Sequence, residues 1–387
     1  MTSQKPKIML VAGEPSGDRL GASLMSALKR RLTDVTFVGV GGTAMTAEGL
    51  KSSVPISDIA VMGLVEVIPR LPKLMGHIRN TAKLARQERP DVLVTIDAPG
   101  FNFRLAQRLA DTDIPRVHYV APSVWAWRPG RAKKVAPLFD HLLALLPFEP
   151  PYFEAVGLPT TFVGHPAAEQ NHRGDAIGFR KRNTLSDDAE ILVVLPGSRR
   201  SEVDRLLPIF SETVQRVCAS RPGLRIVVPT VEHLKGTVSK AVQLWPGAPI
   251  VVTGEVARHD TFATATTALA ASGTVSVELA LAGVPAVIAY DVNKVTAAIA
   301  KHLVKTNHVS LVNILLNRAA VPEYLLGKCR ADLLAPAVAA LLDDPEAREK
   351  QRQAYRSALD MLKPPRYLPS EVAADVVVGL IKQKDTE

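Results

Sequence analysis

The stretch Ile8-Met9-Leu10-Val11-Ala12-Gly13-Glu14-Pro15-Ser16-Gly17-Asp18 decides the fold of this chain of 387 residues. Its apolar first half predicts a short buried strand, and the small residues that follow predict a tight loop. An amphipathic segment, Leu20–Leu32, comes next and has the pattern of a helix. A strand, a small-residue loop and a helix in this order begin a Rossmann-like α/β unit.

Short apolar runs and amphipathic segments go on alternating through most of the chain. Runs of this length between helices are typical of buried parallel strands that helices cover on both faces. We therefore predict an α/β fold built from doubly wound sheets. The further strands are expected at Thr36–Val40, Val92–Ile96, Arg116–Val120, Leu142–Leu146, Thr161–Val163, Ile191–Leu195, Arg225–Pro229, Ile250–Thr253, Ala268–Ala271 and Pro285–Ala289.

A polar stretch at about 168–189 separates two halves of this type, and we interpret it as a linker. The predicted domains are an N-terminal Rossmann-like domain at 1–168 and a C-terminal one at 190–365, facing each other across a cleft. A last segment at 366–387 contains a predicted helix, Pro369–Lys384, that could pack back on the first domain. A chain of this length favours two domains over one.

The loop after the first strand is the first candidate for ligand contact. Small residues between a strand and a helix let backbone N–H groups and the helix start approach a ligand closely. Alternatively, Asp18 caps its own helix and the glycines only turn the chain. The small residues do not have the G-x-G-x-x-G spacing of a dinucleotide site, and the second strand ends in glycines instead of an acid. The candidate contacts of the cleft are Gly13, Glu14, Ser16, Gly17 and Asp18.

Asp97 stands at the end of the strand Val92–Ile96. Ligands of open α/β sheets bind at this edge. A carboxylate there can accept a proton from an attacking hydroxyl group, which makes Asp97 a candidate general base. The alternative is an N-cap for the following helix, which the intervening Pro99-Gly100 pair disfavours.

The loop after the next strand contains Trp125, Trp127 and Arg128. Two indoles and a guanidinium in one loop could stack on a sugar and hold a phosphate. Simple packing of the tryptophans explains the pattern almost equally well. We treat Trp125 and Arg128 as candidate acceptor or cleft contacts.

Two loops of the second half have the residue types of a diphosphate site. Ser198 and Arg199 lie near a predicted helix start, where anions are favoured. A second small-residue loop opens another helix, with Glu278 about one turn in, where it could accept hydrogen bonds from ribose hydroxyls. A buried glutamate without such a role would be costly. The small residues of this loop are Ser272, Gly273 and Thr274.

Composition narrows the class of protein further. Lys and Arg outnumber Asp and Glu by 47 to 38, a net charge of +9, which favours polyanionic partners. Aromatic residues make up only 5%, and they are not interleaved with basic stretches, which argues against nucleic acid. Cys218 and Cys329 have neither disulfide-framework nor metal-ligand spacing, as suits a reducing cytosol. A secretory signal and an apolar stretch of about 18 residues are both missing, so we expect neither secretion nor a membrane span.

Taken in order, the motifs resemble those of the lipid-A-disaccharide synthases, glycosyltransferases of the two-domain GT-B architecture. The resemblance covers nearly the whole chain, and the order of the motifs makes it specific. The motifs are Ala-Gly-Glu-Pro-Ser-Gly-Asp at 12–18, Val-Met-Gly-Leu-Val-Glu-Val at 61–67, Ile-Asp-Ala-Pro-Gly-Phe-Asn at 96–102, Tyr-Val-Ala-Pro-Ser-Val-Trp-Ala-Trp-Arg at 119–128, Leu-Pro-Phe-Glu at 146–149, Leu-Pro-Gly-Ser-Arg at 195–199, Ala-Ser-Gly-Thr at 271–274 and Leu-Val-Lys-Thr-Asn-His-Val-Ser-Leu-Val-Asn at 303–313.

This resemblance implies that UDP-2,3-diacylglucosamine donates its sugar to the 6-hydroxyl of 2,3-diacylglucosamine 1-phosphate, giving a β-1,6 disaccharide and UDP. The implied reaction inverts the anomeric carbon, and Asp97 matches the family's candidate base. Leu326 stands where the family usually has glutamine, which puts one donor contact in question. The residues that fall where the family handles the UDP-sugar are Ser198, Arg199, Ser272, Gly273, Thr274, Glu278 and Asn313.

The segment from Ile59 to Lys83 mixes apolar and basic side chains. An apolar surface rimmed by positive charge is typical of a segment that reaches acyl chains beneath anionic headgroups. A buried helix with solvated basic edges is the alternative, and the net charge favours membrane contact. We expect a cytoplasmic protein on the inner membrane of a Gram-negative bacterium. The candidate membrane contacts are Val61, Met62, Leu64, Val67, Ile68, Arg70 and Lys73.

Asp111-Thr112-Asp113 matches the Asp-x-Asp motif that holds a metal in other glycosyltransferases. It falls between a helix and a strand, away from the ligand edge, so we interpret it as a solvated turn. We expect no metal and no other cofactor, since the UDP-sugar is a substrate. The expected partners are the two acylated sugars and an anionic membrane, and the apolar C-terminal half could support a homodimer.

Three alternative functions remain open from the sequence. The nearest is another GT-B enzyme that uses unacylated UDP-N-acetylglucosamine, as a transferase or an epimerase. A nicotinamide-dependent oxidoreductase lacks its fingerprint here, and a non-catalytic membrane-surface module is the third.

Overall fold

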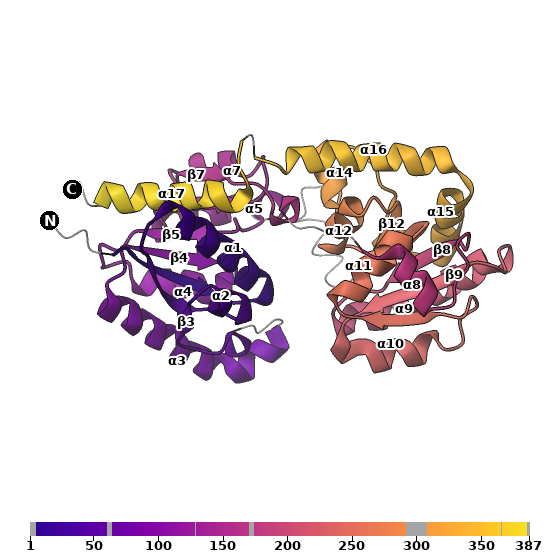
Figure 1. Cartoon of the computed structure of the whole chain (residues 1–387), viewed down its shortest axis with the longest axis horizontal. Coiled ribbons are helices and arrows are strands. Elements are labelled where there is room, and N and C mark those ends of the chain that lie inside the picture. The colour runs from indigo at the N-terminus through magenta and orange to yellow at the C-terminus, as the bar shows by residue number, and fades with distance from the viewer. Residues whose placement is uncertain are drawn as a thin grey trace. The chain divides into compact units, whose positions relative to one another are not determined.

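The computed structural model describes residues 5–59, 64–127, 129–169, 174–291, 308–364 and 366–384. Within these ranges, the side chains of residues 57, 64–70, 126, 127, 129, 168, 383 and 384 are not described. The chain divides into two compact units (Figure 1). The first comprises Met1–Glu169 and Leu362–Glu387, and the second comprises Gln170–Met361.

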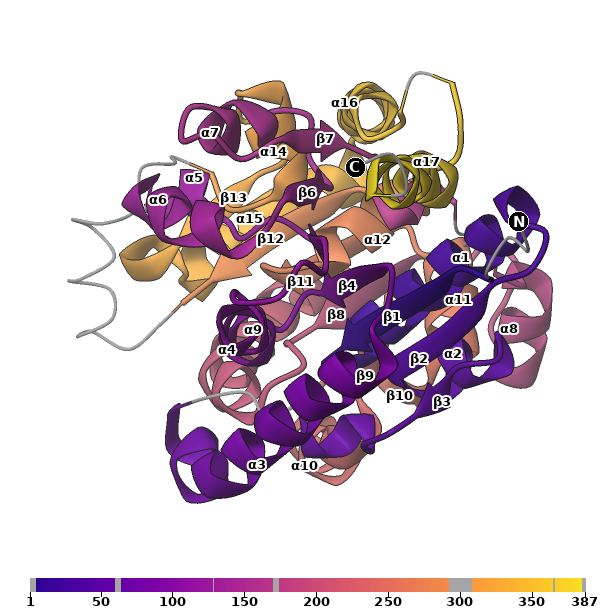
Figure 2. The ribbon, with the colours of Figure 1, turned by 90° about the vertical axis from the view of Figure 1, so that its left-hand side faces the viewer.

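The first unit is built on seven parallel strands in the order β3-β2-β1-β4-β5-β6-β7. Figure 2 shows β1 and β4 side by side, although β2 and β3 lie between them in the sequence. The strand order therefore reverses between β1 and β4. The strands are β1 (Lys7–Ala12), β2 (Thr36–Val40), β3 (Lys51–Ser52), β4 (Val92–Ile96), β5 (Arg116–Tyr119), β6 (His141–Ala144) and β7 (Thr160–Phe162).

Helices cover both faces of this sheet, because side chains along each strand alternate between two apolar clusters. Leu24 of α1 and Val377 of α17 belong to the cluster on one face, and Ile78 of α3 and Phe101 of α4 belong to that on the other. The C-terminal helix α17 lies along α1 (Figures 1 and 2). The helices are α1 (Pro15–Arg31), α2 (Thr43–Ala47), α3 (Leu64–Glu88), α4 (Pro99–Arg108), α5 (Val124–Trp127), α6 (Ala132–Val135), α7 (Pro150–Glu154) and α17 (Pro369–Lys384).

The second unit is built on six parallel strands in the order β10-β9-β8-β11-β12-β13. Its order reverses between β8 and β11, and α9 and α15 pack with the strands into one apolar core. The strands are β8 (Ile191–Leu195), β9 (Arg225–Thr230), β10 (Ile250–Thr253), β11 (Thr267–Ala271), β12 (Ala286–Tyr290) and β13 (Glu323–Leu325). The helices are α8 (Ala176–Arg182), α9 (Arg200–Ala219), α10 (Lys235–Val242), α11 (Glu255–Thr264), α12 (Val275–Leu281), α14 (Leu311–Leu316), α15 (Ala331–Asp343) and α16 (Pro345–Met361).

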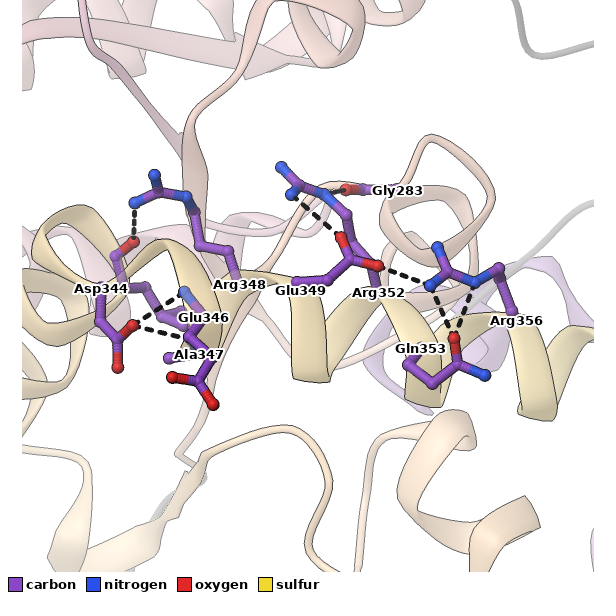
Figure 3. A network of polar contacts seen from close by, with 10 residues as sticks. Gly283, Asp344, Glu346, Ala347, Arg348, Glu349, Arg352, Gln353 and Arg356 are labelled. Carbon is purple, nitrogen blue, oxygen red and sulfur yellow. Dashed lines mark hydrogen bonds and ion pairs between the residues drawn. The ribbon is translucent and has the colours of Figure 1, made fainter.

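Helix α16 is held to the second unit by polar contacts (Figure 3). Asp344 accepts hydrogen bonds from the backbone N–H groups of Glu346 and Ala347, at 2.8 and 3.0 Å, and so caps the helix start. Arg352 donates to the carbonyl of Gly283 at 3.1 Å, which ties the helix to the turn after α12. These contacts fix α16 on the second unit up to the point where the chain enters the first unit again.

The prediction of a linker at 168–189 is wrong over part of that range. Helix α8 forms within it and packs against α11. The backbone N–H of Asp175 donates to Asp260 at 2.7 Å, and Arg182 pairs with the same carboxylate. The segment therefore belongs to the second unit, because its charged residues satisfy a buried carboxylate there.

Among the strands, the remaining differences from the expected elements are shifted ends and two additional short strands. The strand expected at Arg116–Val120 ends at Tyr119, since Val120 has a φ of +83° that no strand residue adopts. Strands β3 and β13 were not predicted, because two or three edge residues are too few to show alternation. Among the described helices, none combines the length and the apolar character that a bilayer span needs.

Candidate active site

Asp97 follows β4 directly, beside the point where the order of the first sheet reverses. Its backbone N–H donates to the carbonyl of Tyr119 at 2.9 Å, which continues the pairing of β4 with β5. Asp97 and Ala98 both have left-handed backbones, with φ values of +50° and +44°. Such backbones are strained for residues other than glycine, and functional sites are one place where they gather. The strain turns the chain sharply at the ligand edge of the sheet.

Two neighbours hold this strained turn. The buried amide of Asn102 donates to the carbonyls of Ile96 and Asp97, at 3.1 and 2.7 Å. A Cβ atom on Gly13 would stand 2.3 Å from the Cβ of Ala98, so only glycine fits there. The loops after β1 and β4 therefore meet at the switch point, where open α/β sheets bind ligands.

The carboxyl group of Asp97 is half-buried. Burial raises its pKa, and a hydrogen bond from the backbone N–H of Ala98 partly opposes this effect. The N-cap of α4 is Ala98, without a side-chain cap, so the capping alternative for Asp97 is wrong. A carboxylate with a raised pKa at a ligand edge is a stronger base than an ordinary aspartate.

The structure corrects the interpretation of Asp18. Its carboxylate is only 5% exposed and accepts hydrogen bonds from the N–H groups of Gly42, Ala44 and Met45, at 2.7, 2.9 and 3.1 Å. Asp18 therefore caps α2 and not its own helix, because the start of α2 turns three N–H groups toward it. Of the other loop residues, Gly17 is buried, whereas Ser16 is exposed in the first turn of α1 and Glu14 precedes it as the N-cap.

Trp125 lies in α5, in the loop after β5. Its indole Nε1 donates to Glu149 at 3.2 Å, and its ring meets Phe148 edge to face, with ring centroids 5.2 Å apart. Both packing and a polar anchor thus hold this half-buried side chain. Arg128, the other candidate of this loop, lies outside the described residues.

A pocket opens at the switch point of the second sheet, between the loops after β8 and β11. Five predicted donor contacts line it, namely Ser198, Ser272, Gly273, Thr274 and Glu278. Thr230, Val231, Glu202 and Arg258 line it as well.

The start of α9 is engaged by a carboxylate of its own. Glu202 accepts hydrogen bonds from the backbone N–H groups of Ser198 and Arg199, at 3.2 and 3.3 Å, and pairs with the Arg199 guanidinium at 2.7 Å. A diphosphate bound here would compete with Glu202 for these donors. Arg199 itself is exposed and is not among the residues that line the pocket.

Arg258 of α11 was missed by the sequence analysis. Its Nε lies 2.9 Å from a carboxylate oxygen of Glu278, and both side chains line the pocket. The guanidinium and the carboxyl group thus attract each other at the wall of the pocket. The pair joins α11 to α12, and a residue that acts across two helices leaves no local signal in the sequence.

Asn313 is not among the residues that line the described pocket. It is fully buried and its amide closes the turn after α14: it accepts from the N–H groups of Ala320 and Val321, both at 2.8 Å, and donates to the carbonyl of Val321. Its position is set by this turn. Leu326, where the family has glutamine, begins the turn after β13 with a φ of +53° and is likewise not among the pocket residues.

The predicted membrane contacts are described only in part. Val61 and Met62 lie outside the described residues, as do the side chains of Leu64, Val67, Ile68 and Arg70. Further along α3, Leu71 is 43% exposed, and Lys73 pairs with Asp58 at 2.8 Å. One face of the helix is nevertheless core, because Ile78 is fully buried.

Two Rossmann-like units with ligand loops at both switch points define a protein of the GT-B class. Solved structures with this fold include a putative UDP-N-acetylglucosamine 2-epimerase from Listeria monocytogenes, with a TM-score of 0.66 and 15% identity over 99% of this chain and 97% of that chain. The glycotransferase of kitacinnamycin has a TM-score of 0.62 and 17% identity over 98% of this chain and all of its own, 100%. These likenesses show the fold alone.

Sequence comparison is more specific. The model of the family described as Lipid-A-disaccharide synthetase matches residues 8–377. Proteins named lipid-A-disaccharide synthase are 50% identical in Rhodospirillum centenum, over 97% of this chain and 95% of theirs, and 48% identical in Paramagnetospirillum magneticum, over 97% and 98%. The chain belongs to the lipid-A-disaccharide synthase family, glycosyltransferases of lipid A biosynthesis.

Proposed function

We propose that the protein transfers the sugar of UDP-2,3-diacylglucosamine to the 6-hydroxyl of 2,3-diacylglucosamine 1-phosphate, with inversion, and releases UDP. The observation that carries the proposal is Asp97, a half-buried carboxylate with a raised pKa on a strained turn at the ligand edge of β4. Acylated sugars as substrates follow from the family name, since lipid A is acylated.

In the proposed reaction Asp97 acts as the general base. The proton of the 6-hydroxyl moves to a carboxylate oxygen of Asp97 while the hydroxyl oxygen forms its bond to the anomeric carbon. The bond from that carbon to the diphosphate breaks, and its electron pair leaves on UDP. One base and one leaving group on opposite sides of the carbon give inversion. The rate should fall as the pH falls through the raised pKa of Asp97, because only the carboxylate accepts the proton.

We assign the donor to the pocket of the second unit. Ser272, Gly273 and Thr274 precede α12, where backbone N–H groups favour a diphosphate, and the side-chain oxygens of Glu278 can accept from ribose hydroxyls.

We propose that no metal is needed. Asp111, the first acid of the Asp-x-Asp sequence, pairs with Arg86 at 2.7 Å in an exposed turn between α4 and β5. Helix starts and the guanidinium of Arg258 can instead stabilise the charge that develops on UDP.

We also propose that the substrates are met at an anionic membrane surface on the cytoplasmic side. The support is the net charge of +9, together with the exposed side chains of Leu71 and Lys73 on α3. Binding of the protein to vesicles that contain anionic lipid, and its loss at high salt, would test this part.

Replacing Asp97 tests the chemistry. With both acylated substrates, Asp97→Asn and Asp97→Ala should lose about 10²- to 10⁴-fold in turnover and keep their affinity for UDP. Asp113→Asn, in the exposed turn, is the matched control and should keep native turnover with and without a chelator. Near-native turnover in Asp97→Asn would show that another group is the base.

The second candidate is an enzyme for unacylated UDP-N-acetylglucosamine, because a putative 2-epimerase of that sugar shares the two-unit fold. Epimerisation of this substrate without an acceptor, or transfer from it at the rate seen with the diacylated donor, would replace the first proposal by the second.

A further inference from the structure

Glu149 is a buried acid that the proposed mechanism does not use. It ends the Leu-Pro-Phe-Glu stretch at 146–149, which follows β6 at the ligand edge of the first sheet. Its side chain belongs to a residue only 3% exposed, and no cation of the described residues forms an ion pair with it. Burying an unpaired carboxylate is costly. An acid at this buried position therefore costs free energy of folding relative to an apolar residue.

The contacts of Glu149 show what the acid holds. One carboxylate oxygen accepts from the indole Nε1 of Trp125 at 3.2 Å, and the other accepts from the backbone N–H of Leu146 at 3.0 Å. The Trp125 ring also meets Phe148, with an interplanar angle of 87°. Two consecutive residues of one loop thus fix the position and the tilt of an indole in the neighbouring loop.

The two loops lie next to that of Asp97, because β4, β5 and β6 are neighbours in the sheet. The strands end nearly in step: Asp97 donates to the carbonyl of Tyr119 at 2.9 Å, and Val120 donates to that of Leu143 at 3.0 Å. Trp125 then follows Val120 within one short turn. The indole and the candidate base therefore leave the same edge of the sheet from adjacent strands.

We propose that Glu149 is a positioning residue for the acceptor: it holds the Trp125 indole as the surface against which the acceptor sugar ring lies while Asp97 takes its proton. This inference rests on the proposed transfer reaction. An aromatic face suits the apolar face of a sugar ring, and a polar anchor on Nε1 leaves that face available. The same burial that raises the pKa of Glu149 to about 7 strengthens its hydrogen bond to the indole when it is ionised.

Steady-state kinetics with the full-length protein and both acylated substrates tests the inference. Glu149→Leu should raise the KM for the acceptor about tenfold, as the loss of one such anchor implies, and leave the donor KM and kcat within about twofold. Glu149→Gln retains one acceptor oxygen, so its KM for the acceptor should lie between those of the native protein and Glu149→Leu. Glu154→Gln, an exposed acid of α7, is the matched control and should behave as the native protein.

A double-mutant cycle separates positioning from general damage. Trp125→Phe should raise the acceptor KM by itself, and adding Glu149→Leu should change it little further, because both remove the same surface. In a background with Trp127→Phe and Trp245→Phe, the emission of Trp125 should shift and become more sensitive to acrylamide quenching in Glu149→Leu. If that variant fails to fold, Glu149→Gln provides the same readouts.

The outcomes distinguish this inference from the function on which it rests. An unchanged acceptor KM in a folded Glu149→Leu, or additive effects with Trp125→Phe, would overturn the positioning role while the native transfer activity stands. Absence of transfer by the native protein would overturn the proposed function itself.

Discussion

Replacing Asp18 by alanine should destabilise the first unit by about 3 kcal/mol. The carboxylate accepts three N–H groups at the start of α2, of which that of Met45 is in a buried hydrogen bond and those of Gly42 and Ala44 are in partly buried ones. A hydrogen bond to a charged group contributes about 1.5–3 kcal/mol. We take the buried bond near the middle of that range and count the two partly buried bonds at much less, because water can reach their donors. Together they give the total of about 3 kcal/mol.

For a unit of this size such a loss should lower the melting temperature by about 6–12 °C. Differential scanning calorimetry of the full chain measures it, and Asp18→Asn should show about half the loss, because it keeps the oxygen that serves Gly42 and Met45. Asp34→Ala removes an exposed acid in the loop between α1 and β2 and is the control, expected within about 0.5 kcal/mol of the native protein. A melting temperature of Asp18→Ala within about 1–2 °C of that of the native protein would refute the capping role of Asp18.

Two further predictions concern a pocket residue and a buried histidine. Arg258→Met removes the cation beside Glu278 and should weaken UDP binding about tenfold in calorimetric titration. Arg216→Met, on the exposed face of α9, is the control and should bind UDP as the native protein does. If Arg258→Met also binds UDP with native affinity, Arg258 is not part of the donor site. His118 is buried and neutral, bonded to Thr95 at 2.8 Å, and burial lowers its pKa to about 3. The unfolded chain binds a proton at this histidine below about pH 6.5, whereas the folded chain does not. The free energy of unfolding should therefore fall as the pH is lowered from about 6.5 toward 3, by up to about 1.4 kcal/mol per pH unit. Denaturant titrations at a series of pH values should show that this free energy depends less steeply on pH in His118→Phe.

The fold could be predicted from the sequence because buried parallel strands are continuous apolar runs. The β4 run Val92–Ile96 is buried at every residue. The strand predicted at Ile191–Leu195 has the same bounds as β8. The failures lie where geometry is decided by residues distant in sequence. That Asp18 caps a helix 25 residues further on depends on how α1 and α2 meet, and no local pattern encodes it.

Site residues divide in the same way. Small residues after a strand were enough to place Ser272 and Thr274 at a pocket. Asn313 was assigned by resemblance, and only the structure shows that its amide closes a turn. Glu149 and Arg258 act through a tryptophan and a glutamate of other elements, so their roles appear only when those elements are packed together.

The C-terminal helix has a consequence for how this protein is made. Because α17 completes the core of the first unit beside α1, the nascent unit lacks one of its packing partners until residues 369–384 have left the ribosome. The second unit, whose residues are contiguous, can finish folding earlier. During synthesis, the apolar core residues around Leu24 and Leu28 therefore lack this packing partner while the second unit emerges, and the first unit is open to chaperone binding for that time.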